Sequence, residues 1–161
     1  VGFGRAAEIM KAEMQSDVDR VRPLRDRLMA NILENIEDTT LNGPRERRLP
    51  NNANIRVAYI EGESLLLRLD MEGVQVSSGS ACSARTLEPS YVQLAMGVKH
   101  EEAHGSLQFT FGRWSTEDDV DLVLEVLPPI VKQLREMSAF KPGMTYDKED
   151  FGHHDHGDVE E

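Results

Sequence analysis

The chain contains one cysteine, Cys82, which lies in a run of small residues. Residues 77–84 read SSGSACSA, so hydroxyls, methyl groups and one glycine surround the thiol. This composition is typical of a loop. A thiolate is a nucleophile and a metal ligand, and a loop can carry it from a donor to an acceptor. The run therefore suggests a nucleophile or a sulfur carrier, while a buried, inert cysteine stays open as the alternative.

Four segments of the chain resemble the cysteine desulfurases of the NifS/IscS type, in that family's order and at similar spacing. The family strings are V-E-G-E-S-L, S-S-G-S-A-C followed by L-E-P-S-Y, A-H-S-S, and L-G-R-F-T-T-E-E. The matching residues here are YIEGESLL at 59–66, VSSGSACSA at 76–84 with LEPSYV at 87–92, AHGSL at 103–107, and FGRWSTED at 111–118. The resemblance covers residues 1 to about 138.

The resemblance implies a chemical role for Cys82. In this family a larger domain binds pyridoxal phosphate and free cysteine, and the loop cysteine takes the substrate sulfur as a persulfide. Cys82 is thus implied to be the catalytic nucleophile that passes sulfur to a scaffold or acceptor protein for iron–sulfur cluster assembly. The family's cofactor lysine and phosphate ligands have no counterpart here. We therefore expect that this chain has no cofactor-binding residue and that a companion large domain or chain binds the cofactor. The family forms homodimers through its large domain, so a homodimer is expected through that absent part.

One position departs from the family pattern. The family has an arginine in the strand before L-G-R, where it holds the substrate carboxylate, and this chain has Gln108. Glutamine can hydrogen-bond a carboxylate but lacks the charged, bidentate fork of arginine. Gln108 is our candidate substrate-binding residue, with a solvated strand residue as the alternative. Arg113 lies nearby in the sequence and is a candidate to compensate.

Other functions stay open at this point. A non-catalytic module would use Cys82 as a sulfur relay or as a transient iron–sulfur cluster ligand, since a thiolate binds iron. Gln108 would then reflect lost substrate binding. A related class-V aminotransferase or a selenocysteine lyase is a third possibility, although a plain aminotransferase needs no loop thiol.

The composition of the chain limits which partners it can bind and where in the cell we expect it. The 161 residues carry a formal net charge of −11, which disfavours binding to nucleic acid phosphates. No apolar run approaches the ~20 residues of a membrane helix, so we expect no membrane partner. One cysteine cannot form an internal disulfide, which fits a reducing compartment and a cytoplasmic location.

Hydrophobic periodicity predicts a fold of the α+β class. Helices and strands alternate over one small mixed sheet covered by helices, similar to the small C-terminal domain of fold-type I pyridoxal-phosphate enzymes. Proline is expected to kink or divide the first helix at Pro23 and to break the last at Pro128–Pro129. The predicted helices are 4–36, 61–71 and 89–97, and a last helix whose inner face runs from Val120 to Leu134. Gly73 is expected to close the second helix, and Ser115 or Thr116 to cap the last one. The predicted strands are 39–42, 55–59, 74–76 and 107–111.

The composition shifts near residue 139. Residues 1–138 are predicted to form one domain, and residues 139–161 an acidic, flexible tail. The tail holds His153, His154 and His156 among aspartates, and a solvated tail and a divalent-metal site are both open there.

Overall fold

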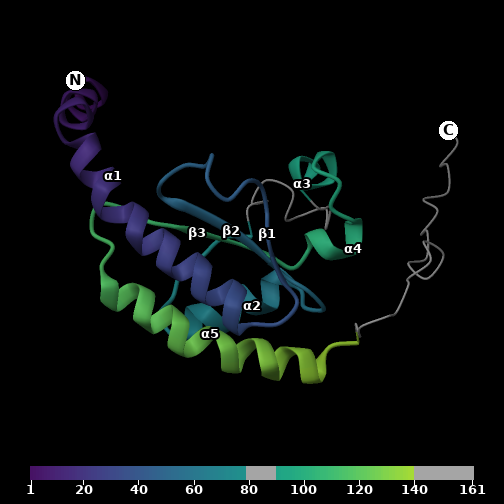
Figure 1. The fold of residues 1–161 in the computed structure, drawn as a ribbon. Coiled ribbons are helices and arrows are strands. Elements are labelled where there is room, and N and C mark those ends of the chain that lie inside the picture. Colours follow the sequence, from purple (N-terminus) through teal and green to yellow (C-terminus); the bar gives the residue numbers. More distant parts are fainter. Residues whose placement is uncertain (79–89, 140–161) are drawn as a thin grey trace, which may run out of the picture.

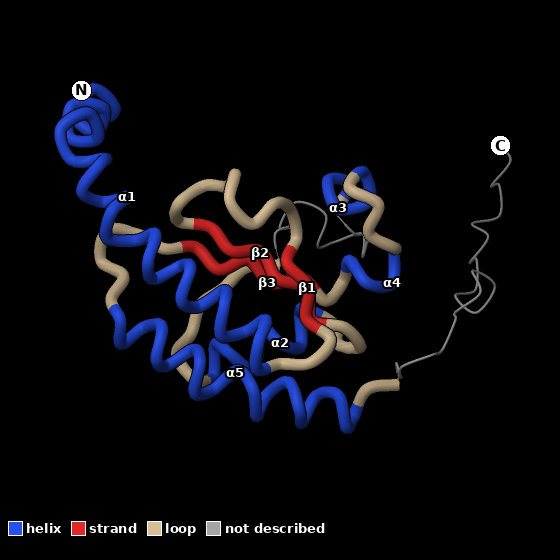
Figure 2. The backbone as a smooth tube through the Cα atoms, in the orientation of Figure 1, coloured by secondary structure: helices blue, strands red, loops and turns tan. Residues whose placement is uncertain are grey.

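A computed structural model describes residues 1–78 and 90–139 of the chain. Its centre is a sheet of three antiparallel strands in the order β1–β2–β3, formed by Thr39–Leu41, Asn52–Val57 and Ser106–Thr110. Helices α1 (Gly2–Asn35), α2 (Gly62–Met71) and α5 (Glu117–Met137) pack on one face of it (Figures 1 and 2). The predicted α+β class is confirmed, and the described sheet is wholly antiparallel rather than mixed.

Alternation along the strands creates one apolar and one polar face. In β2 the burial alternates at every residue, with Ala53, Ile55 and Val57 almost completely buried. Leu107 and Phe109 of β3 face the same side, because successive side chains of a strand point to opposite faces. These side chains join the helices in one core. The intervening polar residues of both strands are left on the face that α1, α2 and α5 do not cover.

Helix α1 is a single helix through Pro23, so the predicted division there is wrong. Proline removes one backbone hydrogen bond and strains the preceding turn. Val21 lies before the proline, and Leu24 and Leu28 after it; all three are buried in the core. Packing on both sides of Pro23 therefore keeps the two halves in one helix.

Helix α5 likewise continues through Pro128 and Pro129, and the predicted break is wrong. Leu127, Ile130 and Val131 are buried immediately before and after the prolines, which holds both halves against the core. The predicted helix start is confirmed at Thr116. Its side chain accepts a hydrogen bond from the Asp119 backbone, and the Asp119 side chain accepts one from the Thr116 backbone, which forms a capping box.

The remaining elements connect the sheet to the cysteine segment. Helix α2 closes at Gly73, whose φ of 82° is the left-handed conformation that favours glycine. The strand predicted over 74–76 is reduced to one isolated bridge between Ser77 and Gln108. The strand predicted to reach Tyr59 ends at Val57, because Tyr59 has a φ of 67° and turns the chain toward α2. Helix α3 (Tyr91–Ala95) was predicted in part, and α4 (His100–Ala103) was not predicted.

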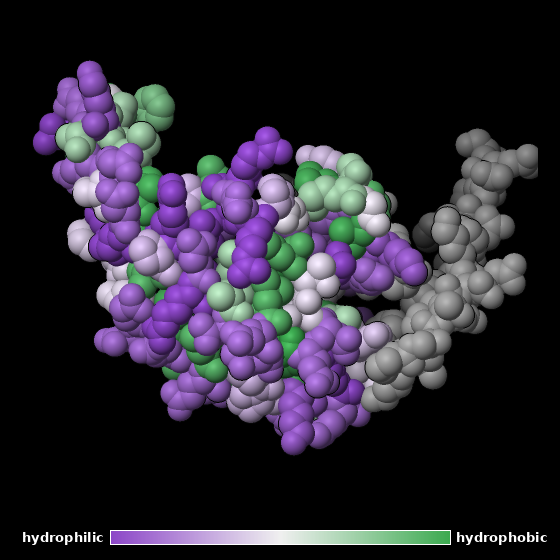
Figure 3. Space-filling view, in the orientation of Figure 1, coloured by the Kyte–Doolittle hydropathy of each residue, from purple (hydrophilic) through white to green (hydrophobic). Residues whose placement is uncertain are grey.

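The N-terminal end of α1 projects beyond the packed body (Figure 1). No residue before Val21 is buried. Phe3, Met10 and Met14 remain 91%, 46% and 53% exposed, and Figure 3 shows green, apolar side chains among purple ones at this end. These three residues follow a helical spacing, so they form an apolar stripe that nothing in the described residues covers.

The predicted boundary near residue 138 stays a prediction. Helix α5 ends at Met137, and the predicted tail, including His153, His154 and His156, lies outside the described residues apart from its first position.

Candidate functional site

Cys82 lies outside the described residues, so its role as nucleophile or as iron ligand stays a prediction. The chain enters the segment that contains it through Ser77 and Ser78, and leaves it at Ser90. The described part of the site therefore consists of the elements that hold these two ends.

Gln108 fastens the entrance of the cysteine segment to the sheet. The Gln108 backbone N–H donates to the Ser77 carbonyl at 2.6 Å, and the Ser77 N–H donates to the Gln108 carbonyl at 3.3 Å. On its other side, Gln108 pairs with Asn54 of β2. The predicted substrate-binding residue thus lies beside the cysteine segment, half-buried, on the polar face of the sheet. Its role in substrate binding stays a prediction.

The same face carries a polar cluster centred on the buried Asn42. The Asn42 amide nitrogen donates to the Asn54 side-chain oxygen at 2.8 Å and to the Ser106 hydroxyl at 3.1 Å. Its side-chain oxygen accepts a hydrogen bond from Arg56 at 3.2 Å. The guanidinium of Arg56 also pairs with Glu102 of α4 at 3.2 Å. These contacts hold Asn42 and Arg56 together on the same face of the sheet as Gln108.

Sequence reasoning missed Arg56, Asn42 and Asn54 as members of this face. Arg56 was visible only as a polar residue alternating with Ile55 and Val57, which predicts exposure to solvent. Its relation to Gln108 depends on the pairing of β2 with β3, and these strands are separated by about fifty residues in the sequence.

The side chain of Arg113 contacts helix α1. Its guanidinium pairs with Glu13 at 2.7 Å and with Asp17 at 3.0 Å, both on α1. The hydrogen bond to Asp17, supported by attraction to Asp17 and Glu13, raises the pKa of Arg113 above its ordinary value. Arg20 of α1 donates to the carbonyls of Gly112, Arg113 and Ser115. Arg113 thus helps to join α1 to the turn after β3, and its compensation for Gln108 stays a prediction.

The described residues do not fit a pyridoxal-phosphate site. Such a site needs a lysine in a pocket, and the described lysines, Lys11, Lys99 and Lys132, are all exposed. Among the described residues no group of three His, Cys, Asp or Glu side chains could hold a metal ion. No helix in that part of the chain has the length and apolarity to span a bilayer.

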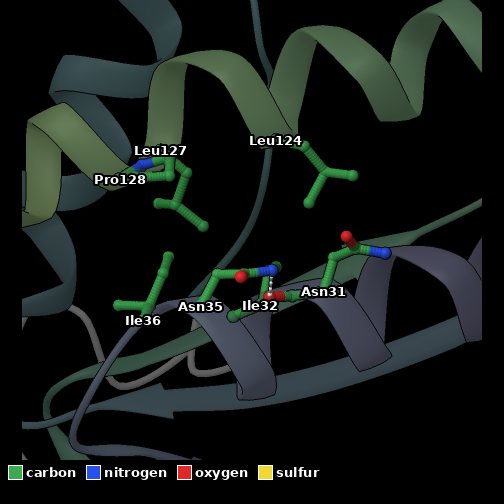
Figure 4. A pocket seen from close by; sticks show the side chains of 7 residues that line it. All are labelled: Asn31, Ile32, Asn35, Ile36, Leu124, Leu127 and Pro128. Atoms are coloured by element: carbon green, nitrogen blue, oxygen red, sulfur yellow. Dashed lines mark hydrogen bonds between the residues drawn. The ribbon is translucent and has the colours of Figure 1, made fainter.

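A hollow in the described surface lies away from Gln108. It has a volume of about 150 Å³ and lies between α1 and α5, in the helical layer (Figure 4). Its lining is mostly aliphatic, from Ile32, Ile36, Leu124 and Leu127, and Asn35 donates to the Asn31 carbonyl at its edge. It contains no ionisable side chain and is separated from the polar face by the core. We therefore do not assign it to the site.

Comparison with known proteins defines the class to which this fold and site belong. Residues 1–123 match the family model "Aminotransferase class-V", so the chain belongs to the class-V aminotransferase family. The chain is 57% identical over 138 residues to "Cysteine desulfurase IscS 1" of Archaeoglobus fulgidus. This alignment covers 86% of this chain and 36% of the relative. The chain is 48% identical over 141 residues to "Cysteine desulfurase IscS" of Dictyoglomus turgidum, covering 88% of this chain and 36% of the relative.

A solved structure agrees on the fold. The NifS-like protein from Rickettsia africae superposes with a TM-score of 0.70 at 22% identity, over 81% of this chain and 33% of that one. The resemblance to cysteine desulfurases seen in the sequence is confirmed. The chain spans about a third of the length of the relatives that it matches.

Proposed function

We propose that this chain is the sulfur-accepting part of a cysteine desulfurase. The observation that carries the proposal is its identity of 57% and 48% to two proteins named cysteine desulfurase, over nearly the whole of the core. The structure supports it locally, because β3 holds the entrance of the cysteine segment directly beside Gln108.

In the proposed reaction the Cys82 thiolate attacks the sulfur of L-cysteine. The carbon–sulfur bond of the substrate breaks, a sulfur–sulfur bond forms on Cys82, and the substrate carbon takes up a proton and leaves as L-alanine. Atoms and electrons balance without an external oxidant. A thiolate of an acceptor protein then attacks the outer sulfur of the persulfide, and Cys82 leaves as a thiolate. The transferred sulfur serves iron–sulfur cluster assembly in the cytoplasm.

The cofactor, pyridoxal phosphate, belongs on a companion part in this proposal. Two observations support a companion: the chain spans about a third of its relatives, and its described lysines are exposed. The exposed stripe of Phe3, Met10 and Met14 on α1 is the surface that we assign to the large domain. A buried apolar stripe stabilises a helix that would be marginal if it projected alone into water. Dimerisation is assigned to the same absent part.

The sulfur-relay or iron–sulfur ligand function is the second candidate, and Gln108 is the observation behind it. A neutral amide at this position weakens binding of a substrate carboxylate, which a relay does not need. The names of the relatives favour the enzyme.

Sulfide release separates the two functions. The chain is combined with the large domain, pyridoxal phosphate, L-cysteine and an excess of a dithiol reductant, which reduces the persulfide to thiol and sulfide. Sulfide is then measured for the wild type and for Cys82→Ser. The enzyme predicts sulfide that is lost in Cys82→Ser. The relay predicts no sulfide in either protein, but persulfide on Cys82 when an external persulfide donor is supplied.

A further inference from the structure

Gln108 leaves the proposed carboxylate site without a cation. A substrate carboxylate is bound most strongly by a guanidinium, which offers charge and two parallel N–H donors. If this chain supplies the missing charge, a cationic side chain near Gln108 is needed. Arg48 and Arg113 both have other partners.

Arg48 is committed to backbone carbonyls. It donates to the carbonyl oxygens of Asn42 at 2.7 Å and Pro44 at 2.8 Å, and more weakly to that of Asn52. Burial, with the nearby charge of Arg25, lowers its pKa. Arg113 is paired with two carboxylates of α1. Both side chains therefore have structural roles in joining loops to the sheet or to α1.

We propose that Arg56 is the residue that binds the substrate carboxylate, in place of the arginine that Gln108 replaces. This proposal rests on the proposed function and names the group that recognises its substrate. Arg56 stands on β2, on the same polar face as Gln108, and its guanidinium already holds a carboxylate.

The strand register places Arg56 and Gln108 as neighbours on one face of the sheet. Asn54 pairs directly with Gln108, and Arg56 pairs with Ser106. Arg56 and Gln108 are therefore diagonal neighbours on one face, about 7–8 Å apart at the backbone. An arginine side chain is long enough to cover this separation, so its charge can act at the position where the family's arginine would act.

The surroundings of Arg56 hold its guanidinium ready for an anion. The side chain is 13% exposed, so a charge contact there is screened less than one in bulk water. Asn42, itself fixed by Asn54 and Ser106, orients one end of the guanidinium. Glu102 occupies another donor but is 42% exposed, so its carboxylate can return to water when a substrate carboxylate binds.

Substitution of Glu102 therefore distinguishes a substrate-binding role of Arg56 from a purely structural one. If Arg56 served only to join β2 to α4, removing either partner would weaken the structure in the same way. If Arg56 binds the substrate, Glu102 competes with the ligand, and the two substitutions change affinity in opposite directions. A merely structural pair does not produce that contrast.

The test uses the complete enzyme, with this chain joined to its large domain and cofactor. The variants are Arg56→Gln, Glu102→Gln and the exchange Arg56→Gln with Gln108→Arg. Arg68→Gln is the matched control, because Arg68 contacts Gln133 on the helical side of the core. Two readouts are taken: the KM for L-cysteine, and calorimetric binding of L-alanine and of ethylamine, which lacks the carboxylate.

Arg56→Gln is expected to raise the KM for L-cysteine and the Kd for L-alanine about 10- to 100-fold, as for loss of a charged hydrogen bond. Ethylamine binding stays unchanged, and the exchange variant recovers most of the affinity for L-alanine. Glu102→Gln binds L-alanine more tightly, and Arg68→Gln matches the wild type. Unchanged L-alanine binding in Arg56→Gln overturns the proposal.

If Arg56→Gln does not fold, Glu102→Gln decides: tighter L-alanine binding supports the proposal, and equal or weaker binding overturns it. Failure of the proposed function would be seen in sulfide release rather than in L-alanine binding. A wild-type enzyme that releases no sulfide dependent on Cys82 refutes the desulfurase, whereas the binding of L-alanine still reports on Arg56.

Discussion

Gly62 is a position where one added methyl group should disturb the start of β3. It is the first residue of α2, and its N–H donates to the His104 carbonyl at 2.8 Å. A β-carbon at Gly62 would lie 2.6 Å from this carbonyl oxygen and 3.2 Å from that of Ser106. Both oxygens are backbone atoms at the start of β3, so they cannot rotate away as a flexible side chain could.

The size of the effect follows from these distances. Ordinary van der Waals contact begins at 3.4 Å, so the His104 carbonyl must retreat by about 0.8 Å. That retreat stretches the hydrogen bond from Gly62, at a cost of about 1 kcal/mol, and overpacking adds roughly 1–3 kcal/mol. Alanine's better helix propensity returns at most about 1 kcal/mol. We expect Gly62→Ala to destabilise the chain by about 2 kcal/mol.

The assay is thermal and urea unfolding followed by circular dichroism. A loss of about 2 kcal/mol lowers the Tm by roughly 4–8 °C in a chain of this size. Gly112→Ala is the matched control, because a β-carbon there meets nothing within 4 Å, and its expected change is below about 0.5 kcal/mol. Equal stability of Gly62→Ala and Gly112→Ala would refute the close approach of α2 to β3.

Three further outcomes test the fold and the assembly. Asn42→Ala should lower the unfolding free energy by about 1–3 kcal/mol in urea titrations, because its side-chain partners on the polar face lose their hydrogen bonds. Thr116→Ala should cost about 0.5–2 kcal/mol in the same titrations through loss of the α5 cap, and Thr116→Ser should retain the cap. Met14→Glu should weaken binding to the large domain about tenfold or more in calorimetry, through loss of its apolar contact, while Ala12→Glu on the opposite face of α1 should not.

Much of the fold follows from local patterns in the sequence. The alternation of Ile55 and Val57 with polar residues predicts a half-buried strand, and the structure has one there. The capping residue Thr116 and the closing Gly73 were also visible, because caps depend on residues only a few positions apart. Local rules failed at Pro23 and at Pro128–Pro129, where packing of distant elements outweighs the loss of a backbone hydrogen bond.

Some residues of the candidate site could likewise be predicted from local sequence, and others could not. Cys82 and Gln108 could be named from short strings and from the family resemblance. The polar face around Gln108 could not, because Asn42, Arg56 and Glu102 come from a loop, a strand and a helix that meet only through strand register and helix packing. Arg113 shows the converse, since it is near Gln108 in the sequence yet pairs with α1.

The most direct measurement is the sulfur content of Cys82 after turnover. The complete enzyme is mixed with L-cysteine, quenched with an alkylating reagent and digested. The mass of the peptide that contains Cys82 is then measured by mass spectrometry, and the released L-alanine is quantified. We predict one additional sulfur atom on Cys82 and one L-alanine released for each persulfide formed in the first turnover. L-alanine formation with no added sulfur on that peptide, or unchanged turnover in Cys82→Ser, would contradict the proposed role of this chain.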